Sequence, residues 1–157
     1  MYNETAQQRY ALLHKLEKRR GTKIITLVGI SPFSELDDRA AEKIIANIKK
    51  AGSSDIEIVI NTDGGSIKAG WNITRAILCR NGTTNIIVVN KAKSTGTLIS
   101  LAADKIIACQ EAEFGPFDPK IPIEREGRTF YCPAVELLSS NEEWERRQAE
   151  NAIKEVS

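Results

Sequence analysis

Two short polar loops in this chain contain the residue types that acyl-transfer chemistry requires. The first is Asp63-Gly64-Gly65, and the second is Lys93-Ser94-Thr95-Gly96. Adjacent glycines allow free backbone N–H groups to approach a developing oxyanion, and Ser94 offers a hydroxyl nucleophile at the start of an apolar segment. The two loops therefore predict a nucleophile opposite an oxyanion site, provided that the fold brings them together.

Each loop also has a simpler interpretation. A glycine pair between a strand and a helix is common in ordinary turns, and a serine before a helix is commonly its N-cap. The glycine loop is not a Walker loop, because Trp71-Asn72 stands where Lys-Ser/Thr is required. The Gly-x-Gly-x-x-Gly spacing of dinucleotide-binding loops is also missing.

Both loops follow segments that are predicted to be buried strands. Residues 55–60 and 85–90 are short β-branched runs, and apolar residues recur at helical spacing from Ser66 and over 98–103. Ligands in α/β folds collect at the carboxyl ends of parallel strands. The pattern predicts an α/β domain with a largely parallel sheet or a coil of ββα turns.

The remaining elements are predicted from periodicity and turn residues. Ser34, with Asp37 three residues later, resembles a capping box in which aspartate replaces the usual glutamate, and it predicts the start of a helix. The basic residues at the end of the first helix complement the helix dipole and are interpreted as a solvated helix end. The expected spans are helices over about 4–20, 34–50 and 133–156, and strands over 23–28, 104–109 and 128–131.

Composition indicates a single globular domain over residues 1–157. A chain of this length buries about 70% of its unfolded surface, and a net charge of +1 argues against a nucleic-acid partner. Without a membrane-length apolar run or a signal peptide, we expect a cytoplasmic protein. The three cysteines, Cys79, Cys109 and Cys132, are predicted to be buried free thiols. Neither a metal nor a cofactor is expected.

Three ordered motifs carry a resemblance to a known family. They are residues 61–65 (Asn-Thr-Asp-Gly-Gly), 92–104 (Ala-Lys-Ser-Thr-Gly-Thr-Leu-Ile-Ser-Leu-Ala-Ala-Asp) and 114–119 (Phe-Gly-Pro-Phe-Asp-Pro). From about Gln8 to Leu138 the chain resembles the Clp-fold serine proteinases, and most of all the serine dehydrogenase proteinases, which are related to signal peptide peptidase A.

The resemblance implies a ClpP/crotonase-like fold, in which ββα units form a spiral core and protomers assemble into homo-oligomers. It implies that Ser94 is the nucleophile, that the Gly65 and Thr95 N–H groups form the oxyanion hole, and that Gly64 shapes the loop. The implied activity is ATP-independent hydrolysis of a peptide or unfolded protein. The chain departs from the family at Asp63, where proline is usual, and at Thr95, where a small residue is common.

The general base is the part of the site that the sequence leaves open. His14, the single histidine, is far from every motif, whereas Asp118 falls where Clp proteases place theirs. A lysine can serve if desolvation lowers its pKa, and Lys120, just after the rigid 113–119 loop, is the first choice. A base from another protomer is a further alternative. The other lysine candidates are Lys93, Lys91 and Lys68.

We therefore predict a serine peptidase or related acyl hydrolase. Two alternatives stay open from the sequence. One is crotonase-type chemistry on an acyl thioester, which would need a coenzyme A pocket. The other is a catalytically silent relative that serves as an assembly or binding module, which the absence of a catalytic histidine favours.

Overall fold

The computed structural model describes residues 2–29, 35–117, 120–125 and 127–133, together with residues 136, 143, 147, 150 and 151. Contacts divide the chain into two units, Met1–Gly115 and Pro116–Ser157, and each is described by itself. The second unit contains an antiparallel hairpin of β6 (Lys120–Arg125) and β7 (Arg128–Pro133). The helix expected over 133–156 lies almost entirely outside the described residues, and Pro133 is the last residue of β7.

The first unit is built on a parallel sheet, as the β-branched runs predicted. Its strands are β1 (Lys23–Val28), β2 (Ile56–Thr62), β3 (Thr84–Ala92) and β4 (Lys105–Ala108), which pair in that order. A two-residue strand, β5 (Glu113–Phe114), pairs in parallel with the last two residues of β3. The mixed α/β class and the largely parallel sheet are confirmed.

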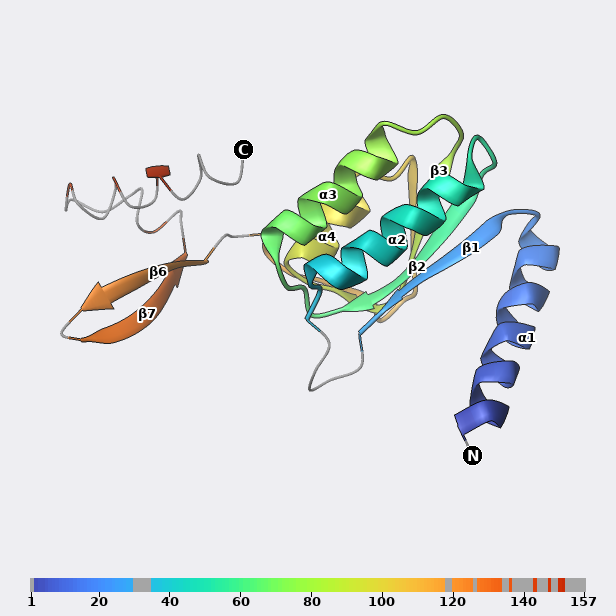
Figure 1. The fold of residues 1–157 in the computed structure, drawn as a ribbon, viewed down its shortest axis with the longest axis horizontal. Helices are drawn as coiled ribbons and strands as arrows, with labels where there is room; N and C mark the ends of the chain where they lie inside the picture. The colour runs from blue at the N-terminus through green and yellow to red at the C-terminus, as the bar shows by residue number, and fades with distance from the viewer. Residues whose placement is uncertain are drawn as a thin grey trace. The chain divides into compact units, whose positions relative to one another are not determined.

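Helices cover one face of this sheet. They are α2 (Asp38–Ala51), α3 (Ile67–Leu78) and α4 (Thr95–Leu101); α2 and α3 lie side by side, and α4 packs against α3 (Figure 1). Alternate strand residues and one stripe of each long helix form a core of isoleucine, in which full burial of each side chain contributes about 1.5–3 kcal/mol. Its fully buried members include Ile48, Ile56, Ile58, Ile60, Ile73 and Ile86.

The first helix, α1 (Tyr2–Arg20), docks through its last turns at the amino end of the sheet. The Glu17 carboxylate accepts a hydrogen bond from the Ile24 N–H at 3.1 Å, and the Arg20 guanidinium pairs with Glu57 on β2. Arg20 is therefore not merely a solvated helix end. Among the described residues, no helix has the length and apolar character needed to cross a membrane.

Several local expectations were wrong. The second helix begins at Asp38 with Asp37 as its N-cap, whose carboxylate accepts from the Ala40 N–H at 2.7 Å; Ser34 lies outside the described residues. Trp71, an apolar residue of α3, is 39% exposed, because the buried face of this helix is formed by other residues, among them Ala69, Ile73 and Ile77. The thiols of Cys79 and Cys109 are free but exposed, since both residues follow the ends of elements.

Candidate active site

The ends of β2 and β3 bring the glycine loop against the serine loop. The Lys93 N–H donates to the Thr62 carbonyl at 3.0 Å, which fastens the two strand ends together. A Cβ placed on Gly64 would lie 2.8 Å from the Cβ and 3.3 Å from the Oγ of Ser94. Only glycine permits this approach, since real Cβ atoms essentially never come within 3.0 Å of another heavy atom in this way. The two loops that the sequence singled out are therefore in direct contact.

The backbone of Ser94 is strained. Its φ is 51° and its ψ is −119°, and it is the sole non-glycine residue with positive φ in the part of the chain that the structure describes. Such a conformation costs about 1–3 kcal/mol and persists where the surroundings impose it. Ser94 precedes α4 but its side chain makes no capping hydrogen bond, so the N-cap interpretation does not explain this serine.

Relief of this strain gives a first testable prediction. A Ser94→Gly variant should unfold at a higher denaturant concentration, with a gain of about 1 kcal/mol, because glycine adopts positive φ without a steric cost. Ser94→Ala is the matched control, since it removes the hydroxyl and keeps the Cβ. Chemical denaturation compares the two variants with the wild type. A glycine variant no more stable than the alanine variant would show that Ser94 stores no strain.

The backbone of Leu36 pairs with the glycine loop. The Leu36 N–H donates to the Gly64 carbonyl at 2.8 Å, and the Ser66 N–H donates to the Leu36 carbonyl at 2.7 Å. These two hydrogen bonds involve the residues on either side of Gly65, whose φ is +148°. The Gly64 N–H is occupied by Thr62 Oγ1 at 3.1 Å. Among the described residues the Gly65 N–H therefore has no acceptor.

The first N–H of α4 is also unused. Thr95 begins this helix, so its N–H has no acceptor within the helix, and none comes from elsewhere in the described residues. The carbonyl of Ser94 accepts from the N–H groups of Thr97 and Leu98 at 2.9 and 3.2 Å. The glycine loop and the serine loop thus each contain a backbone donor without an acceptor among the described residues, and such donors are what an oxyanion site requires.

Comparison with known proteins assigns the chain to a family. Residues 1–145 match the family model of the ClpP-like SDH-type serine proteinases. The chain belongs to this family. Two uncharacterized proteins of Methanocaldococcus jannaschii are similar. One is 32% identical over 130 residues, covering 76% of this chain and 46% of that protein. The other is 32% identical over 124 residues, covering 73% and 42%. The chain spans less than half the length of these relatives.

Thr95 stands where the resemblance implies a small residue, and the structure shows how its side chain is accommodated. Thr95 is fully buried, and a Cβ placed on Gly70 of α3 would lie 2.9 Å from its Cβ. A glycine in the facing helix therefore leaves the room that the larger side chain needs. The Thr95 hydroxyl has no hydrogen-bond partner among the described residues.

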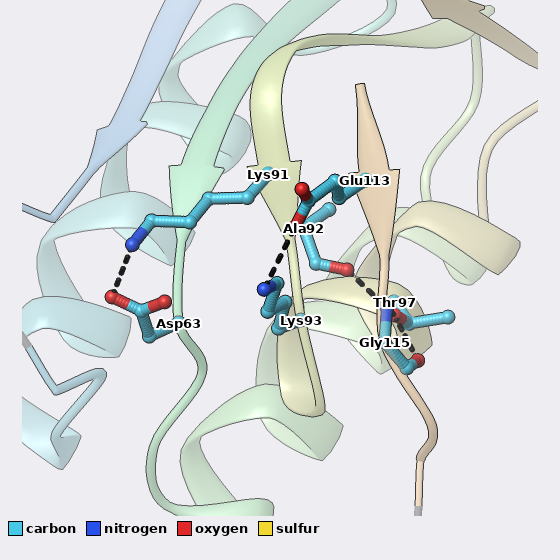
Figure 2. Close-up of polar contacts among 7 residues, drawn as sticks. All are labelled: Asp63, Lys91, Ala92, Lys93, Thr97, Glu113 and Gly115. Carbon is cyan, nitrogen blue, oxygen red and sulfur yellow. Dashed lines mark hydrogen bonds and ion pairs between the residues drawn. The ribbon is translucent and has the colours of Figure 1, made fainter. Parts of the chain in front are cut away.

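Thr97 fastens the serine loop to the ends of two strands. Its hydroxyl donates to the Ala92 carbonyl at 2.6 Å, lies 2.8 Å from the Gly115 carbonyl and accepts from the Gly115 N–H at 3.3 Å (Figure 2). The sequence reasoning missed Thr97 and Leu36. An apolar residue just before a helix N-cap is a known signal for packing on that helix, and correct placement of the cap at Asp37 would have predicted this packing of Leu36 but not its contact with the glycine loop.

Two ion pairs lie beside the serine loop. Lys91 Nζ is 2.6 Å from an Asp63 carboxylate oxygen, and Lys93 Nζ is 2.8 Å from one of Glu113 (Figure 2). The hydrogen bond and charge of Glu113 raise the pKa of Lys93, and the hydrogen bond from Lys93 lowers the pKa of Glu113. A lysine base needs the opposite shift, so Lys93 is not suited to that role.

The other base candidates are placed as follows. Lys68 is largely exposed and 3.9 Å from Asp38. His14 Nδ1 lies 3.3 Å from a Glu17 carboxylate oxygen on α1. His14 is near the amino ends of β1 and β2, whereas Ser94 follows the carboxyl end of β3. Lys120 begins β6 in the second unit, and its side chain is outside the described part; Asp118 is also outside it. No group of three or more metal-ligating side chains occurs in the described ranges.

Proposed function

We propose that this chain is an ATP-independent serine peptidase or related acyl hydrolase with Ser94 as its nucleophile. The observation that carries the proposal is the strained Ser94 backbone, whose side chain caps nothing and lies against the Gly64-Gly65 loop. Membership of the ClpP-like SDH-type serine proteinases supports serine-proteinase activity in general terms. A peptide or unfolded protein is the proposed substrate.

The proposed chemistry is acyl transfer through a covalent intermediate. The Ser94 hydroxyl loses its proton to a general base and attacks the scissile carbonyl, and the oxyanion that forms accepts hydrogen bonds from the Gly65 and Thr95 N–H groups. The base returns the proton to the leaving amine, and water then hydrolyses the ester by the same steps. Lys120 or Asp118 is proposed as the base, with a residue from a second protomer of a cytoplasmic homo-oligomer as the alternative.

Labelling with a fluorophosphonate probe tests this function. Intact-mass spectrometry should detect one adduct on the wild-type chain, and the labelling rate of Ser94→Ala should fall at least about a thousandfold, because the proposal assigns the nucleophile to Ser94 alone. Ser54→Ala, which removes an exposed serine in the turn after α2, is the matched control and should label normally. Adduct formation that persists in Ser94→Ala would contradict the assignment of the nucleophile.

A catalytically silent assembly module is the second candidate. The ion pairs that hold Lys91 and Lys93 favour it, because each lysine is engaged by a carboxylate and the raised pKa of Lys93 disfavours its neutral form. It predicts that a folded wild-type chain gains no adduct under conditions that label an active control peptidase. The same absence of an adduct, together with thermal stabilisation by coenzyme A, would instead indicate crotonase-type binding.

A further inference from the structure

Asp63 carries a negative charge in the loop whose Gly65 N–H the proposed chemistry uses. It immediately precedes Gly64, and Gly64 contacts Ser94 directly. An uncompensated carboxylate in the loop that supplies an oxyanion donor would raise the energy of the tetrahedral intermediate. The acidic residue is therefore compatible with the proposed function only if its charge is balanced locally.

The strand that leads to Ser94 supplies the balancing charge. Between Ile60 and Thr62 the pairing of β2 shifts from Val88 to Ala92, so β3 carries extra residues at this point, and Lys91 is one of them. Its ammonium group is 2.6 Å from the Asp63 carboxylate and 26% exposed, whereas Asp63 is 53% exposed. The bulge in β3 thus directs a lysine toward the loop that precedes the glycines.

The neighbouring lysine does not serve the same purpose. Lys93 Nζ lies 2.8 Å from a Glu113 carboxylate oxygen, and this pair has no net charge with which to balance Asp63. The four groups also influence one another, since the charge of Asp63 helps to raise the pKa of Lys93 and that of Lys91 helps to lower the pKa of Glu113. Loss of Lys91 would therefore leave one net negative charge in the group.

We propose that Lys91 is a positioning residue that neutralises Asp63 and so permits the Gly65 and Thr95 N–H groups to stabilise an oxyanion. This inference rests on the proposed function of Ser94. It extends that proposal, because it explains how an aspartate can stand where proline is usual in the family: Asp63 is accompanied by Lys91, which balances its charge. Neither residue contacts the reacting atoms in this proposal, and both act through the electrostatics of the glycine loop.

The test compares fluorophosphonate labelling rates of Ser94 in five proteins. They are the wild type, Lys91→Met, Lys91→Arg, Asp63→Asn and the double variant Asp63→Asn/Lys91→Met. Lys49→Met is the matched control, because it removes an exposed lysine from the last turn of α2, at the amino edge of the sheet. Circular dichroism and thermal unfolding confirm that each variant is folded.

Lys91→Met should label about tenfold more slowly than the wild type, because one negative charge near the oxyanion is no longer balanced. The double variant and Lys91→Arg should return to within about threefold of the wild-type rate, since both restore local neutrality. The deficit of Lys91→Met should also shrink in about 1 M NaCl, where the screening length falls to about 3 Å. A purely structural role of Lys91 would not depend on salt.

Three outcomes would overturn the inference. They are a wild-type rate in Lys91→Met, a double variant as slow as Lys91→Met, and a deficit that salt does not change. Each of these leaves the proposed function intact, because Ser94 is still labelled. By contrast, a wild-type chain that gains no adduct overturns the proposed function and this inference with it.

Discussion

A Gly65→Ala variant is expected to lose at least about 3 kcal/mol of unfolding free energy and to lose labelling at Ser94. The added Cβ would lie 2.3 Å from the backbone nitrogen and 2.5 Å from the carbonyl oxygen of Leu36, and the φ of +148° is strained for any L side chain. Because the clash is with backbone, no rotamer change relieves it. The loop must move, and the Gly65 N–H moves with it.

Gly21→Ala is the matched control for this prediction. Gly21 also has positive φ, at +68°, but a Cβ there meets nothing within 4 Å. Its replacement should cost about 1 kcal/mol, which is the backbone penalty alone, and should leave labelling unchanged. Urea unfolding monitored by circular dichroism measures both variants. Equal losses in the two variants would show that Leu36 does not constrain the glycine loop.

The contact between the two loops could be predicted from the sequence, because local signals pointed to it. The β-branched runs before Asp63 and Lys93 identified two buried strands, and the glycine pair and Ser94 marked their carboxyl ends. Parallel pairing of neighbouring strands then places those ends at one edge of the sheet, as the register of β2 and β3 confirms. Short-range pattern and a general rule of topology were sufficient here.

The details that shape the candidate site depend on contacts between distant residues. Leu36 bridges the glycine loop from 29 positions earlier in the chain, and neither its type nor its spacing announces that role. The positive φ of Ser94 arises from the surrounding packing, since serine has no preference for it. The β3 bulge that directs Lys91 to Asp63 likewise appears only once the register is known.

Glu57 shows the same limit within a strand. It interrupts the apolar run of β2 and is 1% exposed, yet the pattern indicated only a buried strand. Its partner Arg20 lies 37 positions earlier, at the end of a helix whose basic residues suit the dipole without any partner. A charged residue in a buried strand requires a counter-charge, but the sequence does not identify which one.

An Arg20→Met variant is expected to melt about 10 °C below the wild type at pH 7, because it leaves the Glu57 carboxylate buried without its cation. Arg19→Met, which removes the adjacent cation of the same helix end, should melt within about 2 °C of the wild type. Differential scanning calorimetry compares the three proteins. An equal loss in Arg19→Met would mean that the helix end needs positive charge in general and not the Arg20–Glu57 pair.

The pH dependence of this difference identifies its electrostatic origin. In the wild type the Arg20 hydrogen bond holds the pKa of Glu57 below its usual value, against the opposing effect of burial. The stabilisation is therefore complete above the unfolded pKa of about 4.3 and is lost as the pH falls through the lowered folded pKa. In Arg20→Met the largest effect that lowers the Glu57 pKa is gone, and burial is opposed only by the smaller effects of hydrogen bonds from Asn85 and Thr22. The Glu57 pKa is therefore expected to be higher in the variant, so protonation relieves the variant first. The gap in melting temperature should be widest near neutrality and close below about pH 4. A gap that stays constant from pH 7 to pH 4 would assign the loss to packing of the arginine side chain.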